Sequence, residues 1–365
     1  MKEKEKELFR ALCKFKNISI DDDLTDYASP VVLGHLFFNR MQGIAYGTLK
    51  DSGLLGRTNR EVRNSLKAAY EHNIQKNNSF MTCVKNLCDI LRISECPVAM
   101  LKGAYLCAHY PKGYRTSNDV DLLISPNDVT KIGNILLNSG FKQGDVKNGE
   151  FIPATRKEII ESKMMRGETV PYIKEVNLPY MRFFEVDINF SLDYKNSDDT
   201  VLSEMLENAC TKKEIDISIP TLSNADFFIH LCAHLYKEAT TVPWIKMNRD
   251  MTMYKYCDIY LLLSEKSNKD LDEIFERAAK FNMEKVCAYA ILETVDLFDM
   301  KDTYAYIKSR AVIADEPDFC LKVVAPTEKR MYIYQTENTT ERFFTENRIN
   351  NLKEIQNEQT GNAKK

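Results

Sequence analysis

A run of alternating residues at positions 182–192, RFFEVDINFSL, constrains the fold more than any other feature of the chain. Four apolar residues alternate there with four polar residues: Phe184, Val186, Ile188 and Phe190 with Glu185, Asp187, Asn189 and Ser191. This period of two predicts a β-strand with one apolar face and one polar face. We therefore expect a sheet whose apolar side is covered by other elements and whose polar side is open to chemistry.

Two shorter apolar runs predict further strands. Residues 98–101 form a short apolar run that ends at Lys102-Gly103, a pattern typical of a buried strand that turns into a helix. Residues 120–124, VDLLI, predict a second strand, and the segment SPND follows it directly. Ser125 is a candidate N-cap with Pro126 at the first helical position, so we expect a helix here that ends near Gly140.

Apolar residues recur at three- and four-residue spacing on both sides of these strands. This spacing predicts helices over residues 1 to about 95 and again from about 200 to 312. The sequence thus predicts an α+β fold in which a small mixed β-sheet is flanked by N- and C-terminal helical blocks. The predicted regions are an N-terminal helical region, a sheet core, a C-terminal helical region and a polar tail: 1–95, 96–195, 196–345 and 346–365.

Charge and cysteine usage exclude several classes of protein. The 50 Lys and Arg residues against 53 Asp and Glu give a formal net charge of -3, so no global positive field favours an extended nucleic acid. The ten cysteines include no C-x-x-C pair and suit a reducing compartment. The first residues lack the apolar core of a secretory signal, and no run approaches the roughly 18 apolar residues of a membrane span. We expect a soluble, cytoplasmic protein that neither spans a membrane nor binds extended nucleic acid.

Three aspartates fall on the polar sides of the predicted strands. Asp119 and Asp121 are two residues apart at the start of one strand, and this spacing places both on one face. Asp187 lies on the polar face of the alternating strand. Carboxylates that converge in this way can bind hard divalent cations. The alternative is that Asp119 and Asp121 simply begin a strand as turn residues, because a lone D-x-D is a weak signal.

Positive charge and a glycine lie close to these aspartates in the sequence. A glycine after a strand lets backbone N–H groups approach phosphate oxygens, and Gly103 occupies such a position. Lys102 and Arg115 can supply positive charge to the same phosphates. We place Ser117 with these three residues as a candidate nucleotide ligand.

The order of these features resembles the nucleotidyltransferase superfamily that includes polymerase beta. More closely, it is similar to a bacterial family of uncharacterised nucleotidyltransferases, over roughly residues 30 to 290. The resemblance is carried by LKGAYLCAHYP, YRTSNDVDLLI, SGF, FFEVDINF and HLCAHLYKEA. It implies a palm-like sheet on which Asp119, Asp121 and Asp187 bind two Mg²⁺ ions, with Mn²⁺ as the alternative, while the glycine turn holds a nucleoside triphosphate. Two positions depart from the family pattern, since Ala104 stands where Ser or Gly is usual and Asn189 where His is frequent.

The function that follows is transfer of a nucleoside monophosphate from an NTP, with ATP among the candidates, to a small-molecule or peptide acceptor with release of pyrophosphate. The resemblance also suggests a role in natural product biosynthesis, by analogy alone. Two rivals remain at this point: a D-x-D glycosyltransferase that uses a nucleotide sugar with Mn²⁺, and a non-catalytic nucleotide-binding module. The sequence does not determine the base, the acceptor or the oligomeric state.

Other candidate residues rank lower. His230 and His234 have the i, i+4 spacing of a helical metal pair, but Leu231 stands where a zinc-protease helix carries its glutamate. We favour helix packing for both histidines over a role in the substrate pocket. Aromatic residues at 244–260 could stack on a base, although their apolar neighbours favour a place in the core.

Overall fold

The strand predicted from the alternating pattern is present in the computed structural model as β6 (Met181–Asn189). It lies inside a six-stranded sheet with the order β1-β2-β6-β5-β3-β4. Strands β2 and β6 are parallel and the other neighbouring pairs are antiparallel, so the sheet is mixed. The other five strands are β1 (Val98–Met100), β2 (Asp119–Ile124), β3 (Lys142–Lys147), β4 (Glu150–Pro153) and β5 (Tyr172–Leu178). This mixed sheet among helices confirms the predicted α+β class.

The structure describes residues 1–16, 18–165, 167–192, 199–214 and 217–355. They fall into two compact units, which we call the sheet unit (Gln42–Phe227) and the helical unit (Met1–Met41 with Phe228–Lys365). These units group the N-terminal helices differently from the four regions predicted from the sequence, because helices that precede the sheet are divided between them. The four region boundaries themselves stay a prediction.

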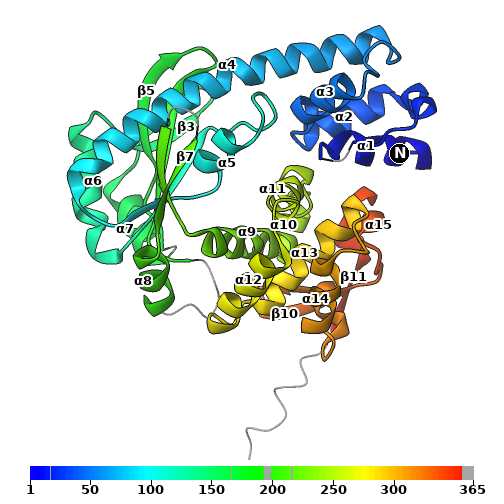
Figure 1. The fold of residues 1–365 in the computed structure, drawn as a ribbon. Helices are drawn as coiled ribbons and strands as arrows, with labels where there is room; N and C mark the ends of the chain where they lie inside the picture. Colours follow the sequence, from blue (N-terminus) through cyan, green and yellow to red (C-terminus); the bar gives the residue numbers. More distant parts are fainter. Residues whose placement is uncertain (17, 166, 193–198, 215–216, 356–365) are drawn as a thin grey trace, which may run out of the picture. The chain divides into compact units, whose positions relative to one another are not determined.

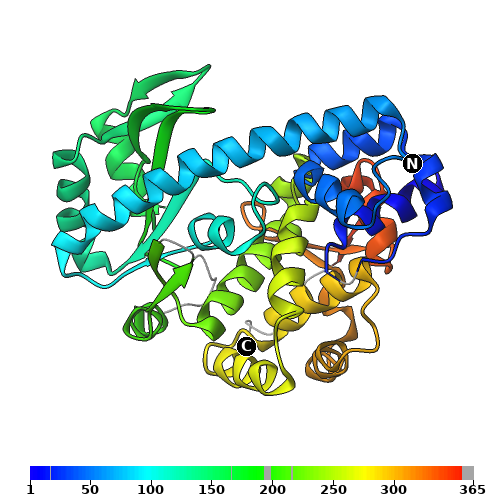
Figure 2. The same ribbon diagram turned by 45° about the horizontal axis from the view of Figure 1, so that its top comes forward.

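Helix α4 (Arg60–Leu91) is the longest helix of the sheet unit and passes along one face of the six-stranded sheet (Figures 1 and 2). It begins at Asn59, whose side chain accepts a hydrogen bond from the backbone N–H of Val62 at 2.8 Å, as an N-cap should. The remaining elements of this unit are α3 (Gln42–Asp51), α5 (Gly103–His109), α6 (Val129–Asn138), α7 (Arg156–Met165), α8 (Asp199–Glu207), β7 (Cys210–Glu214) and β8 (Ile217–Thr221).

The apolar face of the sheet forms the main core of this unit. Phe80, Val84 and Leu87 of α4 are buried in one cluster with residues such as Leu122 of β2 and Val186 of β6. Burial of each large apolar side chain contributes on the order of 1.5–3 kcal/mol. Because successive strand residues point to opposite faces, this core fixes which face of β2 and β6 carries the polar residues.

The helix predicted after residue 124 is also present. The Ser125 hydroxyl accepts a hydrogen bond from the N–H of Asn127, and a short 3₁₀ turn (Pro126–Asp128) leads into α6. Helix α6 ends before Gly140, which has φ +87°. The N–H of Phe141 then returns to the carbonyl of Leu136 at 3.1 Å, which satisfies an end group of the helix. The predicted start and stop of this helix are both confirmed.

The helical unit gathers around α13 (Glu284–Phe298), which packs against α11 (Met253–Leu263), α12 (Asn268–Lys280) and α14 (Tyr304–Val312). Its other helices are α1 (Glu3–Cys13), α2 (Pro30–Phe38), α10 (Val242–Lys246) and α15 (Thr339–Phe344), together with most of α9 (Asn224–Ala239). A three-stranded antiparallel sheet completes the unit: β9 (Lys322–Ala325), β10 (Arg330–Tyr334) and β11 (Leu352–Ile355). The sequence analysis did not predict these strands, and β11 lies within the expected polar tail.

Two buried ion pairs hold the C-terminal part of the helical unit. Arg342, 1% exposed, donates to both carboxylate oxygens of Glu293 at 2.6 and 2.7 Å. Arg348 contacts both oxygens of Asp250 at 2.6 and 2.7 Å. Arg348 uses two nitrogens, which is the bidentate geometry in which a guanidinium and a carboxylate interact most strongly, whereas Arg342 reaches both oxygens of Glu293 from Nη2 alone.

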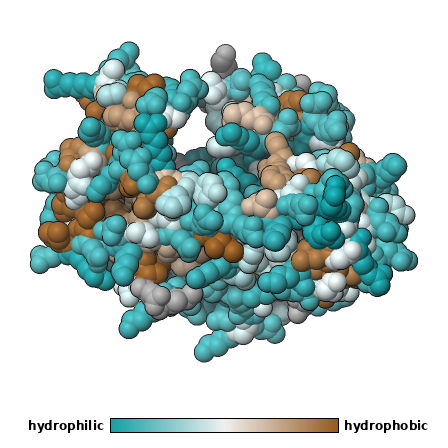
Figure 3. Space-filling view, turned by 90° about the horizontal axis from the view of Figure 1, so that it is seen from above, coloured by the Kyte–Doolittle hydropathy of each residue, from teal (hydrophilic) through white to brown (hydrophobic). Residues whose placement is uncertain are grey.

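The surface offers no single large apolar region on the face seen in Figure 3, which is mainly hydrophilic with separate apolar patches. Exposed apolar residues include Phe38, Ile93, Tyr180 and Ile307, which come from different parts of the chain. In the part of the chain that the structure describes, no helix is long and apolar enough to cross a membrane.

Candidate active site

The polar face of the six-stranded sheet carries four carboxylates at the junction of β2 and β6. In the parallel register of these strands, Asp121 lies opposite Asp187 and Asp119 lies opposite Glu185. Neighbouring strands are about 4.8 Å apart, and directly opposite residues point to the same side of a sheet. The three aspartates predicted from the sequence are therefore brought onto one face, together with a fourth acidic residue.

The protonation behaviour of two of these carboxylates shows how close the charges are. Burial, together with the nearby charges of Asp121 and Glu185, raises the pKa of Asp187 to about 8. Burial also raises the pKa of Glu185 to about 7, with Asp119 the largest charged contributor. Like charges that share a poorly hydrated space favour the neutral form. Asp187 and Glu185 therefore retain protons near neutral pH when no cation is bound.

Three polar side chains contact the two aspartates of β2. The Lys102 ammonium lies 3.4 Å from Asp121, and the Asn189 amide donates to the same carboxylate at 3.5 Å. The Ser117 hydroxyl donates to Oδ1 of Asp119 at 2.9 Å. The structure therefore brings Lys102 and Ser117, both assigned from the sequence, into direct contact with the acidic cluster.

The turn between β1 and α5 is closely packed against this cluster. The N–H of Leu101 donates to the carbonyl of Asp121 at 2.8 Å, which ties the turn to β2. A Cβ atom at Gly103 would lie 2.5 Å from the Ser117 hydroxyl oxygen, so the position accepts only glycine without a shift. Lys102 has φ +40° and ψ −107°, a conformation that glycine adopts much more readily.

Arg115 lies in the segment that leads into β2. It is 9% exposed, and its Nη1 donates to the carbonyl of Thr116 at 2.5 Å. This guanidinium is therefore held within the sheet unit. Its assignment to a nucleotide phosphate stays a prediction.

The four carboxylates suit a divalent cation in chemistry and in placement. Oxygen ligands are those that Mg²⁺ prefers, and the repulsion that raises the pKa of Asp187 would be relieved by positive charge. The side chains as they stand do not form a finished site: among the described residues, no group of three or more His, Cys, Asp or Glu side chains could hold a metal ion. Asp121 instead contacts Lys102, and Asp119 contacts Ser117.

A cavity of about 600 Å³ opens beside β6 within the sheet unit. Its walls come from β3, β4, α7, the segment 168–171 and β6. Asp187 and Glu185 belong to its lining, whereas Asp119 and Asp121 are not among the described residues that line it. The cavity therefore reaches the acidic cluster from the β6 side.

The lower-ranked candidates lie in or at the helical unit. His230 is buried on α9, and Nε2 of His234 lies 3.3 Å from Oε1 of Glu238 one turn later on the same helix. Tyr260 is buried and stacks on Phe298 with 4.2 Å between ring centroids, which is a core contact. These contacts agree with the packing roles favoured from the sequence.

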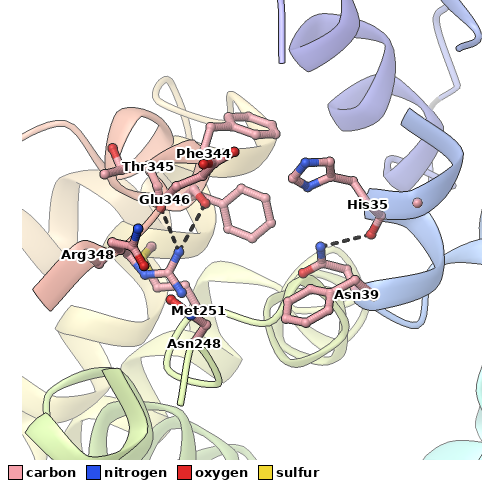
Figure 4. A pocket seen from close by; sticks show the side chains of 12 residues that line it. His35, Asn39, Asn248, Met251, Phe344, Thr345, Glu346 and Arg348 are labelled. Carbon is pink, nitrogen blue, oxygen red and sulfur yellow. Dashed lines mark hydrogen bonds between the residues drawn. The ribbon is translucent and has the colours of Figure 1, made fainter. Parts of the chain in front are cut away.

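A second cavity, of about 390 Å³, lies within the helical unit and is shown in Figure 4. Arg348 on its wall donates from Nη1 to the carbonyls of Phe343 and Thr345, in addition to its pair with Asp250. Asn39 donates to the carbonyl of His35. These polar groups already make hydrogen bonds within the helical unit. This cavity is therefore a weaker candidate for a catalytic site than the acidic cluster.

Glu185 and several residues of the cavity were not predicted from the sequence as part of the site. Glu185 shares the alternating signal of Asp187, two residues later on the same face, and that signal could have identified it. Other cavity residues, such as Asp145 on β3 and Glu158 on α7, come from separate elements. No local pattern links them, because the pairing of distant strands brings them together.

Comparison with known proteins places these residues in a family. No curated protein matches the chain. The crystal structure of an antigenic nucleotidyltransferase-like protein from Paracoccidioides brasiliensis is similar at 12% identity and a TM-score of 0.31, covering 66% of this chain and 90% of that chain. The family described as uncharacterised nucleotidyltransferase matches residues 33–299, well over half of the chain, and this span contains all four carboxylates of the cluster. The chain therefore belongs to the uncharacterised nucleotidyltransferase family.

Proposed function

We propose that this chain is a Mg²⁺-dependent nucleotidyltransferase, with Mn²⁺ as an alternative ion, that transfers a nucleoside monophosphate from an NTP to a small-molecule or peptide acceptor. The observation that carries the proposal is the register of β2 and β6, which sets Asp121 opposite Asp187 and leaves Asp119 on the same face. Family membership supports the same reaction class. The slightly negative net charge favours a small acceptor over a nucleic acid.

Asp119, Asp121 and Asp187 are the residues that would hold the divalent cations, and Glu185 stands beside them. Bound divalent cations would supply positive charge to stabilise the transferring phosphoryl group and the leaving pyrophosphate. Asn189 orients the Asp121 carboxylate and Ser117 orients that of Asp119 through the hydrogen bonds described above.

Lys102 would bind phosphate. Its ammonium is 3.4 Å from Asp121, at the edge of the cluster, where it can move from a carboxylate to a triphosphate oxygen. Arg115 is the second cation of this segment and would add to the binding of the same phosphates. Both residues act through charge and need no covalent intermediate.

Asp187 is the residue best suited to receive the proton of the acceptor hydroxyl. It belongs to the wall of the 600 Å³ cavity, so an acceptor bound there reaches its carboxylate. We assign the acceptor to this cavity and the NTP to the side of Lys102.

The first test is binding. Each NTP is added with Mg²⁺ in a thermal-shift assay, where a ligand at 100 times its dissociation constant stabilises the native state by about 2.7 kcal/mol. We expect one or more NTPs to raise the melting temperature of the wild type and Asp121→Asn to lose the Mg²⁺-dependent part of that increase. Asp89→Asn is the matched control, since Asp89 lies exposed on α4 in a pair with Arg92.

The second test is pyrophosphate release in the presence of candidate acceptors. Release by the wild type, lost in Asp121→Asn and kept in Asp89→Asn, is the result expected. If sugar nucleotides, and not NTPs, raised the melting temperature of the protein, the result would favour a glycosyltransferase. NTP binding without pyrophosphate release from any acceptor would indicate a binding module.

A further inference from the structure

We propose that the acceptor of this reaction is a polyamine-like cation, a molecule with a nucleophilic hydroxyl and at least two ammonium groups, and that it binds in the cavity beside β6. The proposal rests on the proposed function and names the substrate class of the same site. Three observations carry it: the charge of the cavity, an unpartnered buried hydroxyl on its wall, and its continuity with Asp187.

The charge of the cavity is strongly one-sided. Among the described residues that line it, six are acidic and one, Lys147, is basic. The acidic residues are Asp145, Glu158, Glu161, Glu168, Glu185 and Asp187. A concave wall lined by one sign of charge concentrates the field inside it and attracts ligands of the opposite sign.

Neighbouring lysines do little to neutralise this charge. Lys147 lies 3.5 Å from Asp145, and Lys157 lies 3.6 Å from Glu161, but both lysine side chains are more than 60% exposed. Surface pairs of this kind are screened by water and contribute little. Glu158 accepts bonds from Thr155 and keeps its charge, since neither donor is a cation. A ligand with several ammonium groups would therefore meet a wall on which these two described lysines leave most of the negative charge in place.

Thr169 provides the second observation. It lines the cavity and is 3% exposed, and its hydroxyl oxygen has no hydrogen-bond partner in the described structure. Its backbone N–H donates to the carbonyl of Ile188 at 2.9 Å, which fixes it beside β6. A buried hydroxyl without a partner is unfavourable, and a bound ammonium group would supply the missing donor.

The cavity also joins the place where the reaction would occur. Residue 168 bridges to Asn189, so Glu168 lies against β6 two positions from Asp187 on the same face. An ammonium group held at Glu168 would keep a nearby hydroxyl close to the Asp187 carboxylate. In the reaction, that hydroxyl oxygen bonds to the α-phosphorus of the NTP, the bond from this phosphorus to the bridging oxygen breaks, pyrophosphate leaves, and the hydroxyl proton passes to Asp187.

The experiment measures binding of spermine, a tetra-amine, to the full chain by isothermal titration calorimetry, with tetraethylene glycol as a neutral ligand of similar length. We expect spermine to bind, the glycol not to bind, and added salt to weaken spermine binding. The double variant Glu158→Gln/Glu161→Gln should weaken binding at least tenfold, because it removes two charges of the wall and leaves the acidic cluster intact. The matched control is Glu61→Gln/Glu71→Gln, which removes two exposed charges of α4 and should change binding less than twofold.

Thr169→Val is the second variant, because it keeps the shape of the side chain and removes the hydroxyl. We expect it to weaken spermine binding two- to fivefold while the protein folds normally. Equal weakening by the α4 control, or binding of the glycol as tight as that of spermine, would overturn the proposal.

Mg²⁺-NTP binding, followed in the same samples by thermal shift, separates this inference from the proposed function. Intact NTP binding without any spermine binding defeats the cationic acceptor alone. Absence of NTP binding in the wild type defeats the nucleotidyltransferase assignment, and the acceptor role with it. Loss of spermine binding in the wall variant with NTP binding unchanged supports both.

Discussion

The helical unit contains fully buried carboxylates and the sheet unit contains half-buried ones, and the two units surround them in opposite ways. In the helical unit, Glu293 and Asp250 each meet a guanidinium at hydrogen-bond distance. In the sheet unit, Asp187 faces other carboxylates, and burial with their charge raises its pKa to about 8. The helical unit pairs these two buried carboxylates with guanidinium groups, and the sheet unit places like charges together at β2 and β6.

The difference separates carboxylates that stabilise the fold from carboxylates that are suited to bind a ligand. A paired buried charge stabilises only the arrangement that pairs it, so its removal harms the fold. A cluster of like charges opposes folding until something of opposite sign binds, and such clusters mark functional sites more often than structural ones. Substitutions in each unit and a pH titration test this contrast.

The largest effect on stability is expected in the helical unit. Arg342→Met leaves Glu293 buried without its partner and should lower the free energy of unfolding by about 3–5 kcal/mol, measured by urea denaturation. The control Arg60→Met removes an exposed pair and should change stability by no more than about 0.5 kcal/mol. Similar losses from both variants would show that the buried pair is not special.

The sheet unit should show the reverse pattern. Asp187→Asn should lower kcat for pyrophosphate release by about a thousandfold or more, because it removes a group that acts in the transition state. Its stability without metal should not fall, since the substitution relieves repulsion. Lys102→Ala should mainly raise KM for the NTP, and the kinetic comparison of the two variants is the check. Full turnover by Asp187→Asn would remove this residue from the mechanism.

A smaller effect is expected at the glycine turn. Gly103→Ala brings a Cβ within 2.5 Å of the Ser117 hydroxyl and should cost about 1–3 kcal/mol of unfolding free energy through overpacking. The loss should be accompanied by weaker NTP binding, because Ser117 orients Asp119. Gly34→Ala is the control, since nothing lies within 4 Å of that position and an alanine there favours the helix. A neutral Gly103→Ala would mean that the turn relaxes easily.

A further expected effect is a change of stability with pH in the metal-free protein. Asp187 and Glu185 keep their protons in the folded state up to pKa values of about 8 and 7, whereas carboxyl groups in an unfolded chain ionise near pH 4. Between these limits the folded state binds more protons, so its stability should fall as pH rises, by at most about 1.4 kcal/mol per pH unit for each proton. Asp187→Asn should flatten this slope in urea titrations at pH 5 to 8. An identical slope in the variant would contradict the pKa of Asp187.

The sequence predicted the sheet most successfully where local pattern and tertiary packing agree. The alternation in β6 reflects burial of one face of the strand, and the capping signals before α6 reflect local hydrogen bonds. The structure contains both the strand and the helix that these patterns predict. The strands of the helical unit were missed because β9, β10 and β11 are only four or five residues long. Short strands carry too few residues for a clear period.

In the candidate site, too, the residues on recognisable strands could be predicted, and the pairing between distant strands could not. Asp119, Asp121 and Asp187 could be found because each occupies a polar position of a recognisable strand, although their catalytic role stays a proposal. The opposition of Asp121 to Asp187 depends on the register between strands that are more than 60 residues apart, which no local pattern fixes. The walls of the acidic cavity depend on three further elements and were invisible for the same reason.

The backbone at Lys102 has a consequence for how this chain can change. A non-glycine residue at φ +40° and ψ −107° costs on the order of 1–3 kcal/mol, and the surrounding structure must hold it there. Lys102→Gly would relax the peptide and also delete the only part of the residue that reaches Asp121. The chain thus keeps an unfavourable backbone conformation at Lys102, and this conformation accompanies an ammonium group at the acidic cluster. Selection for thermostability alone should therefore drift toward glycine at this position, and selection for nucleotide transfer should restore lysine.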